Sequence, residues 1–441
     1  MLAMYFLYSL TLAVALALSA PWWLWAMLRH GKYRFGVLER FGRVPERLMR
    51  PATGKPAAGA PACIWVHAVS VGEVLAVTEL IRELQQQRPG TRILVSTTTD
   101  TGQMLARHRF GEENVCYFPL DFAFAIRPYL RALRPELIVI AETEFWPNFL
   151  RLAHAAGARV AVVNARISDR SFPRYRRFRG LLQHILAAVD LFLAQSHEDG
   201  RRLIAIGAIA ERVRVAGNLK FDVAPPQQAP FAVELKRRLD QAGAFPVLVC
   251  GSTVEEEELP LLACFQVLLE KYPTAMMVLA PRRPERFDEV ARLLKAFTRI
   301  RCWRRSQLPD DAVLSGGVLL LDTIGELASV YSVATLALVG GSLAPRGGHN
   351  ILEPAFFEVP ILVGPHTENF RDIIGVFREQ EAVRVVRAFR EDGIKGDLTD
   401  SILALMEDQK ERERLGRNAG ETLRSHAGAT TRTVKELEIL L

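Results

Sequence analysis

The first 28 residues of this 441-residue chain contain no charged side chain. The chain also lacks paired cysteines, because its five cysteines are widely spaced and form neither a Cys-x-x-Cys motif nor a cluster with zinc-ligand spacing. This usage excludes a disulfide-stabilised secreted domain and is typical of free thiols in a reducing compartment. The sequence has no Asp-x-Asp motif and no internal repeat at solenoid periods, so it predicts neither a metal-dependent site of that type nor a repeat protein.

Residues 1–28 predict a membrane anchor. Their apolar stretch is longer than the roughly 20 residues that cross a bilayer. It has no basic start, and Pro21 follows the only small-residue site, so a retained anchor is favoured over a cleaved signal peptide. Three tryptophans gather toward its C-terminal end, where aromatic rings favour the membrane interface. The stretch either spans the bilayer or lies in one leaflet.

Residues 29–59 form a basic segment beside the anchor. Seven Lys and Arg lie between Arg29 and Arg50, against Glu39 and Glu46, and they account for most of the net charge of +7. Positive residues beside a membrane helix stay cytoplasmic, so we expect the body of the chain in the cytoplasm. The same segment would attract anionic lipid headgroups. The basic balance therefore favours a membrane surface over nucleic acid.

From residue 60 onward, short apolar runs alternate with amphipathic stretches, which is typical of a parallel sheet with helices on both faces. Residues 224–230 contain three prolines and predict a linker. The sequence therefore predicts an α/β protein with Rossmann-like domains at 60–223 and 231–441, the second ending in a helical tail. The expected strands are Ile64–Ala68, Ile93–Ser96, Leu137–Ala141, Val160–Asn164, Leu191–Gln195, Val247–Cys250, Ala275–Leu279, Val318–Leu321, Leu336–Val339 and Ile361–Val363.

A glycine-rich segment at residues 340–354 follows an expected strand and precedes an expected helix. Glycine lets backbone N–H groups approach a bound anion closely, and the start of a helix adds a favourable dipole. Glu353, a few residues later, is placed to accept hydrogen bonds from a ribose. The segment predicts a nucleotide or nucleotide-sugar site, with a purely structural turn as the alternative.

Polar residues also gather after the expected strands of the first domain. Glu73 begins a helix, where the dipole holds a carboxylate ionised, or it is an ordinary first-turn acid. Glu142 and Glu144 follow a buried strand and are suited to a sugar hydroxyl or to helix capping. The arginines from Arg166 to Arg179 suit phosphate or carboxylate groups, or form an exposed basic face. Lys220 is a candidate anion contact.

The second domain repeats this pattern. Ser252 and Thr253 follow one expected strand and precede an acidic helix start, and Arg282 follows another strand. Ligands in doubly wound folds bind at the carboxyl ends of strands. Polar clusters at several strand ends, split over two domains, therefore predict a site in a cleft.

In wording and order these segments resemble the lipid A 3-deoxy-D-manno-octulosonic acid (Kdo) transferases of Gram-negative bacteria. The resemblance extends from the anchor to about Phe377. It implies the GT-B fold, with two Rossmann-like domains facing across a cleft, the first meeting the lipid acceptor and the second holding CMP-Kdo. The motifs that carry it are His67–Glu73, Glu142–Asn148, Asn164–Ser171, Gly217–Asp222, Pro281–Phe287 and Gly340–Pro354.

The resemblance implies an inverting glycosyltransferase of lipopolysaccharide core biosynthesis at the bacterial inner membrane, moving Kdo from CMP-Kdo to a lipid A precursor. Glu73 matches the family's general base. No metal is expected, because turn N–H groups, helix dipoles and Arg282 would stabilise the leaving phosphate. No cofactor and no nucleic acid are expected either. The residues expected at the donor are Ser252, Thr253, Arg282, Gly340, Gly341, Asn350 and Glu353. Those expected at the acceptor or cleft are Ser70, Glu142, Glu144, Arg166, Arg170 and Lys220.

Two positions depart from the family pattern, since Val254 and Arg283 stand where histidine is common. Both lie in the expected donor domain and predict an altered donor preference. Three other functions stay open. They are a GT-B transferase using another nucleotide sugar on a membrane lipid, a non-hydrolysing nucleotide-sugar epimerase, and a non-catalytic nucleic-acid-binding protein at the membrane.

Overall fold

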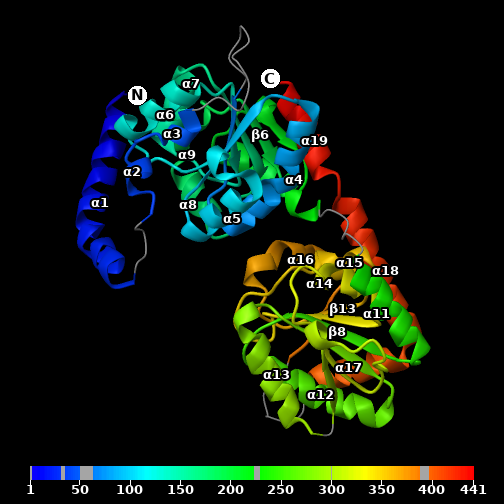
Figure 1. Cartoon of the computed structure of the whole chain (residues 1–441). Helices are drawn as coiled ribbons and strands as arrows, with labels where there is room; N and C mark the ends of the chain where they lie inside the picture. The colour runs from blue at the N-terminus through cyan, green and yellow to red at the C-terminus, as the bar shows by residue number, and fades with distance from the viewer. Residues whose placement is uncertain (1, 31–34, 50–62, 223–228, 299, 388–396) are drawn as a thin grey trace. The chain divides into compact units, whose positions relative to one another are not determined.

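The computed structural model describes residues 2–30, 35–49, 63–222, 229–298, 300–387 and 397–441 (Figure 1). The chain divides into two compact units. Unit 1 comprises Met1–Asp222 and His426–Leu441, and unit 2 comprises Val223–Ser425. Most of the predicted linker at 224–230 lies outside the described residues, and helix α11 begins at its last proline.

Unit 1 is built on seven parallel strands in the order β3-β2-β1-β4-β5-β6-β7. Side chains alternate across a sheet, so Trp65 of β1 belongs to one buried cluster and Val66 to the other. The core therefore lies on both faces of the sheet, as predicted. The strands are β1 (Cys63–His67), β2 (Arg92–Thr97), β3 (Val115–Tyr117), β4 (Leu137–Ala141), β5 (Arg159–Ala165), β6 (Leu191–Ala194) and β7 (Val213–Val215).

Helices cover both faces of this sheet. On one side, α6, α7, α9 and α10 supply the apolar residues that pack with Trp65, and on the other α4, α5 and α19 pack with Val66. The helices of unit 1 are α1 (Leu2–His30), α2 (Val37–Arg40), α3 (Glu46–Met49), α4 (Val71–Gln87), α5 (Asp100–Phe110), α6 (Ala123–Leu133), α7 (Pro147–Ala155), α8 (Phe172–Arg177), α9 (Arg179–Leu186), α10 (His197–Ile206) and α19 (Ala429–Glu438).

The described part of the predicted basic segment is folded onto unit 1. Leu48 is 1% exposed within the core. Arg40 donates a hydrogen bond to the carbonyl of Thr98 at 2.6 Å, and Arg47 pairs with Glu39 at 2.7 Å. The prediction of a separate segment at 29–59 is thus wrong for residues 35–49, because their apolar side chains and arginines are used for packing. Residues 31–34 and 50–59 lie outside the described residues.

Unit 2 repeats the architecture with the strand order β10-β11-β9-β8-β12-β13-β14, again all parallel. Its strands are β8 (Val247–Thr253), β9 (Met276–Pro281), β10 (Arg301–Arg304), β11 (Gly317–Leu320), β12 (Leu336–Val339), β13 (Ile361–Val363) and β14 (Arg384–Val385). Its helices are α11 (Pro230–Gln241), α12 (Glu258–Lys271), α13 (Phe287–Ala296), α14 (Leu327–Val330), α15 (Leu352–Phe356), α16 (Arg371–Glu379), α17 (Asp397–Glu407) and α18 (Gln409–His426), whose last residue is counted with unit 1. Two Rossmann-like units confirm the predicted GT-B class.

The second domain was predicted to extend to residue 441, and this boundary is wrong, because His426–Leu441 belong to unit 1. Helix α19 belongs to unit 1 and lies beside α4 (Figure 1). Its residues Val434 and Leu437 are fully buried in the cluster that α4 also lines. Asp222, the last residue of the first stretch of unit 1, accepts the backbone N–H groups of Gly428 and Thr430. Apolar packing and these two hydrogen bonds bring the tail back to the first sheet.

We expect Leu437→Ala to destabilise unit 1 by about 2–5 kcal/mol, because it deletes a fully buried side chain and leaves a cavity. Thermal unfolding of the detergent-solubilised protein should show a fall in Tm of at least about 4 °C. Ile439→Ala is the matched control, since Ile439 is 75% exposed. An equal effect of the two substitutions would contradict the packing of α19 on α4.

Candidate functional site

The strand order of unit 1 reverses between β1 and β4, which are neighbours in the middle of the sheet. The chain runs from β1 outward to β2 and β3, and from β4 outward in the other direction. Ligands of such sheets bind beyond the carboxyl ends of the strands at this reversal. Glu73 follows β1 and Glu142 follows β4, so the two predicted carboxylates stand on either side of the reversal.

Glu73 lies in the first turn of α4 and is 8% exposed. Its Oε2 accepts the backbone N–H of Val69 at 2.8 Å, and its Oε1 accepts the hydroxyl of Ser70 at 3.1 Å. Ser70 is the residue that precedes the helix. These are contacts of a carboxylate that folds back over a helix start, as an ordinary first-turn acid also makes.

The surroundings of Glu73 also make it a proton acceptor near neutral pH. Burial above all, together with the nearby charges of Glu142 and Glu144, raises the pKa of its carboxyl group from 4.5 to about 7. The hydrogen bonds from Val69 and Ser70 act in the opposite direction. A carboxylate that titrates near the operating pH is suited to general-base catalysis.

Glu142 is held by Lys220 and by a strained backbone. The Nζ of Lys220 lies 2.9 Å from Oε1 of Glu142, and each side chain is 26% exposed. Glu142 has a φ of 57°, a left-handed conformation that costs energy in a residue other than glycine. Lys220 reaches the site because Asn164, near the end of β5, accepts the backbone N–H of Leu219 at 3.0 Å. The structure therefore brings Glu142 and Lys220 together and sets their charges near Glu73.

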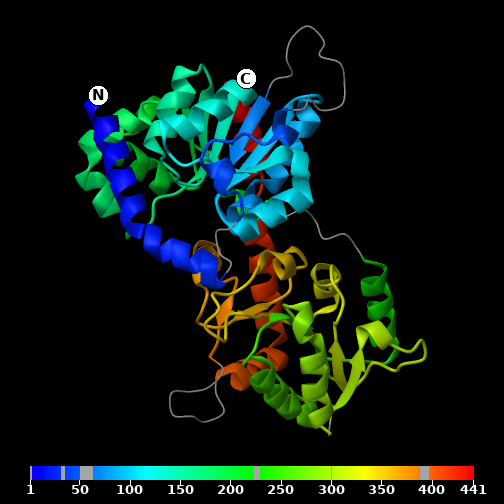
Figure 2. The ribbon, with the colours of Figure 1, turned by 60° about the vertical axis from the view of Figure 1, so that its left-hand side comes forward.

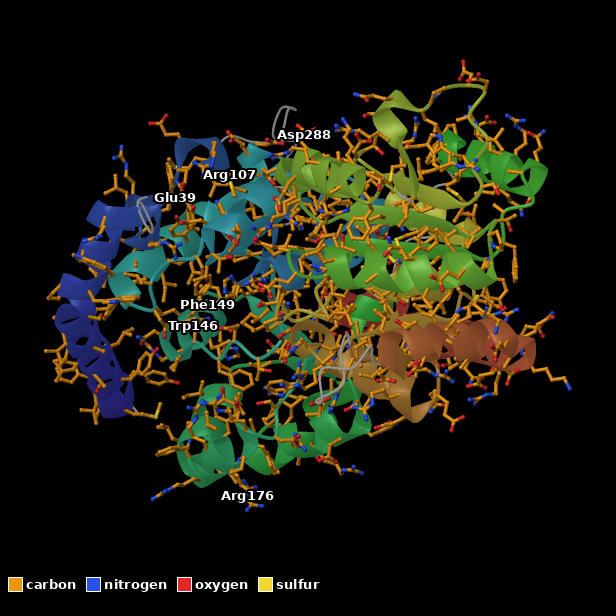
Figure 3. All side chains as sticks on the ribbon, turned by 90° about the horizontal axis from the view of Figure 1, so that it is seen from below. Glu39, Arg107, Trp146, Phe149, Arg176 and Asp288 are labelled. Atoms are coloured by element: carbon orange, nitrogen blue, oxygen red, sulfur yellow. The ribbon has the colours of Figure 1, made fainter. Side chains whose placement is uncertain are left out.

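The remaining acceptor-side predictions divide into two groups. Burial, and then the charge of Glu142, raise the pKa of Glu144, which places Glu144 with the carboxylate cluster. Arg166 is half-buried at the end of β5, where its backbone exchanges hydrogen bonds with the hydroxyl of Thr143. Arg170 is exposed, as is Arg176, which points into solvent (Figure 3). Arg170 and the arginines of α8 thus belong to an exposed basic face.

In unit 2 the strand order reverses between β8 and β12, which are also neighbours. Ser252 and Thr253 end β8, with Ser252 at a φ of 56°. Thr253 is fully buried and donates its hydroxyl to Glu258 at 3.2 Å. Glu258 in turn forms an ion pair with Arg286, whose Nη1 lies 2.6 Å from Oε1 of Glu258. Thr253 is therefore committed to an internal network.

The glycine-rich segment after β12 contains a filled anion site. Glu257 is fully buried, and its two carboxylate oxygens accept a row of backbone N–H groups at 2.8–3.1 Å. These N–H groups are those of Val254, Gly341, Ser342, Leu343 and Ala344. The predicted role of the turn amides in holding a phosphate is thus wrong for the four groups from Gly341 to Ala344, because a protein carboxylate already binds them.

A second polar group in unit 2 surrounds Glu353. Asn350 donates to Glu353 at 3.3 Å. Burial raises the pKa of Glu353, while the Asn350 hydrogen bond and the charge of Arg282 lower it. Burial, and then Arg282, lower the pKa of His349 to about 4, so the His349 ring is neutral at pH 7. Glu353 therefore interacts with two other predicted donor residues, Arg282 and Asn350.

The turn glycines are required by close approaches. A Cβ on Gly341, whose φ is 67°, would lie 2.7 Å from the His349 ring. A Cβ on Gly340 would lie 2.6 Å from the carbonyl oxygen of Ser252 and 2.7 Å from Glu257. Gly340 and Gly341 are thus explained by packing.

Sequence reasoning missed Glu257 and His349. Glu257 was visible only as one of four consecutive acidic residues, which indicated no more than a helix start. His349 lies within the glycine-rich segment, but its neutral state depends on burial. Val254 contributes a backbone N–H to Glu257, and Arg283 is exposed. Among the residues that the structure describes, no cluster of His, Cys, Asp and Glu could hold a metal ion.

Known proteins resemble this chain in sequence and in structure. Residues 36–223 match the family model described as 3-deoxy-D-manno-octulosonic-acid transferase (kdotransferase). A 3-deoxy-D-manno-octulosonic acid transferase of Bordetella pertussis is 36% identical over 429 residues, covering 94% of this chain and 95% of that protein. The enzyme of the same description from Haemophilus influenzae is 34% identical over 415 residues and 92% of each chain.

A solved structure with the same fold is the UDP-GlcNAc 2-epimerase of Neisseria meningitidis bound to UDP-GlcNAc. Its TM-score is 0.51, and the alignment covers 86% of this chain and 100% of that one. The sequences are only 13% identical, so this likeness concerns the fold alone.

We expect Glu257→Gln to destabilise unit 2 by about 1–3 kcal/mol, because an amide NH₂ would face backbone N–H groups and leave them without an acceptor. The substitution should also weaken nucleotide binding if the donor lies against this segment. Thermal unfolding and calorimetric titration of the nucleotide measure the two effects. Glu255→Gln, at an exposed position, should change neither quantity. A Glu257→Gln protein as stable as the Glu255→Gln control would contradict a structural role for the carboxylate.

Proposed function

We propose that this chain, which belongs to the 3-deoxy-D-manno-octulosonic acid (Kdo) transferase family, transfers Kdo from CMP-Kdo to a lipid A precursor with inversion. Membership follows from relatives that are 34% and 36% identical over more than nine tenths of the chain. The chain is accordingly a Kdo glycosyltransferase of lipopolysaccharide synthesis. The donor, the acceptor, the stereochemistry and the residues below are our proposal.

The observation that carries the mechanism is the buried carboxylate of Glu73 beside the reversal point of the first sheet. With a pKa of about 7, the Glu73 carboxyl group is ionised in about half of the molecules at neutral pH. In its ionised form it can accept a proton. The acceptor hydroxyl attacks the anomeric carbon of Kdo as Glu73 takes the hydroxyl proton. The bond between that carbon and the phosphate oxygen breaks, and CMP leaves. A single displacement of this kind inverts the anomeric centre.

Glu142, Glu144 and Lys220 set the field around the base. The two carboxylates raise the pKa of Glu73, and Lys220 neutralises Glu142 in part through their 2.9 Å contact. The carboxylate oxygens and the ammonium group are also suitable partners for sugar hydroxyls and for an acceptor phosphate. We assign them to orientation of the acceptor.

The donor is assigned to unit 2. Glu353, oriented by Asn350, is suited to the ribose hydroxyls. Arg282 is exposed after β9 and lies close enough to influence both His349 and Glu353, so it can meet the phosphate. The amides from Gly341 to Ala344 act indirectly, since Glu257 fixes the shape of the segment that carries Asn350 and Glu353.

The membrane is the natural location for this reaction, because the acceptor is a lipid. Among the described residues, α1 is the one helix whose length and composition would let it cross a bilayer. We place the protein at the bacterial inner membrane with its body in the cytoplasm, where the positive residues after the anchor remain. Anionic lipids would be attracted by the exposed arginines of α8.

The direct test measures CMP release from CMP-Kdo by detergent-purified protein, with and without a tetraacylated lipid A precursor. We expect acceptor-dependent release, reduced by about two orders of magnitude or more in Glu73→Gln. Donor binding without release would indicate another acceptor. Neither binding nor release would direct attention to other nucleotide sugars, given Val254 and Arg283 in unit 2.

The proposed base also predicts a pH profile. Glu73 must be ionised to accept a proton, so kcat/KM should fall about tenfold per pH unit once the pH is below the pKa of about 7. Glu142→Gln removes a negative charge that raises this pKa, so its acid limb should move to lower pH. Glu211→Gln, at an exposed position, serves as the control. A limb that stays in place or moves to higher pH in Glu142→Gln would exclude Glu73 as the titrating base.

A further inference from the structure

The first turns of α1 are attached to the catalytic unit by polar contacts. The side-chain amide of Asn148 donates to the hydroxyl of Ser9 at 3.0 Å. The guanidinium of Arg151 lies 4.7 Å from the centre of the Tyr5 ring, which is 8% exposed. Tyr8 donates its hydroxyl to Asp121. Three residues within two turns of the helix thus have specific partners on the body.

The receiving surface is itself ordered around a buried carboxylate. Asp121 is 2% exposed and accepts the backbone N–H groups of Asn148 at 3.0 Å and Phe149 at 2.7 Å. The amide of Asn148 donates to the carbonyl of Asp121 as well as to Ser9. Met4 of α1 packs against the same core layer as Trp146 and Phe149, which Figure 3 labels. The Trp-Pro-Asn part of the motif after β4 therefore holds the anchor helix.

Exposure along α1 follows the helical repeat. Its covered side chains occur at a spacing of three or four residues, as expected for one stripe of a helix that faces a protein surface. The described side chains of α1 that are buried or half-buried are Met4, Tyr5, Tyr8, Ser9, Leu12, Leu16, Ala20, Trp23 and Met27. The opposite side is apolar and uncovered, with Phe6, Leu7, Leu10, Val14 and Leu18 between 49% and 78% exposed. Figure 2 shows the first turns of α1 (blue) beside unit 1, with the later turns extending past its edge.

These contacts are incompatible with a helix that crosses the bilayer while the body stays in the cytoplasm. In a spanning helix with Arg29 at the cytoplasmic surface, Ser9 would lie about 30 Å away, on the opposite side of the hydrocarbon core. Asp121 and Arg151 could not follow it there without burying two charged groups in lipid. Docking of Ser9 and spanning of α1 therefore exclude each other.

We propose that α1 lies in the cytoplasmic leaflet as a fixed part of the catalytic unit, with its uncovered face in lipid and its N-terminus on the cytoplasmic side. The proposal rests on the membrane location given under the proposed function. The acyl chains of one leaflet are the partner that suits the uncovered face, because this face is continuous and apolar from Phe6 to Leu18. Trp22 and Trp25, 65% and 50% exposed, then stand at interface depth.

The first experiment determines the side of the N-terminus. Four native cysteines are buried and Cys302 is exposed, so Cys302→Ser gives a low-background protein into which Ala3→Cys is introduced. A membrane-impermeant maleimide is applied to intact spheroplasts and to inside-out vesicles. We expect labelling in the vesicles alone, as for Cys302 in the native chain. Labelling in spheroplasts would overturn the proposal.

If Ala3→Cys reacts on neither side, depth measurements decide. Fluorophores are attached to Phe6→Cys, Val14→Cys and Leu18→Cys in turn, and quenched by lipids that carry a nitroxide at a fixed acyl position. A helix in one leaflet gives equal quenching at the three sites. A spanning helix places the first and last about 18 Å apart in depth, so their quenching would differ, and this result would overturn the proposal.

Leu12→Cys, on the covered stripe, is the matched control and should be quenched less than Phe6→Cys. Absence of quenching at every position would show that α1 is not in lipid. Neither experiment requires turnover. A failure of the topology can therefore be told apart from a failure of the assigned reaction, which the CMP-release assay reports.

Discussion

The central strands of both sheets are parallel and buried on both faces, and this constraint determines where a substrate can reach the chain. Trp65 and Val66, neighbours in β1, lie in opposite core layers, so the strand itself offers no surface for chemistry. Polar groups are therefore confined to the strand ends, and those at the carboxyl ends of parallel strands share one edge. Glu73 and Glu142 in unit 1, and Ser252 and Gly341 in unit 2, are all placed by this rule.

Two buried carboxylates show how their surroundings separate structural from chemical roles. Glu257 receives five backbone N–H groups and so has its acceptor capacity filled by the fold. Glu73 receives one backbone N–H and one hydroxyl and has two further carboxylates nearby, which together with burial place its pKa near 7. Desolvation with incomplete compensation is what makes a carboxylate available for proton transfer.

The central strands could be predicted from sequence because burial on both faces produces continuous apolar runs. Leu137–Ala141, Leu336–Val339 and Ile361–Val363 match the observed strands residue for residue. The strands that were not predicted, β3, β7, β10 and β14, stand at the four sheet edges. They are short, and three of them contain arginine, as edge strands often do. Their pairing depends on a neighbour that local pattern cannot reveal.

The candidate site was predictable to a similar degree. The residues at strand ends could be predicted, but their partners could not, because the partners come from distant segments of the chain. Lys220 pairs with Glu142, and Glu257 accepts the N–H of Gly341. The glycine-rich segment presents its N–H groups to an anion, but the anion that we expected there was a bound phosphate. That the anion is a glutamate of the same unit depends on how β8 and β12 sit side by side, which no single segment encodes.

The return of the tail to unit 1 links the packing of α19 to the position of Glu73. Helix α19 contacts α4, and α4 carries Glu73 in its first turn, where the Ser70 and Val69 contacts depend on how the helix begins. Asp222 binds the tail through Gly428 and Thr430, two residues beyond Lys220, which holds Glu142. The groups that set the charge around Glu73 and the groups that fix its helix therefore meet at the tail. A change in tail packing is therefore transmitted through α4 to the surroundings of Glu73.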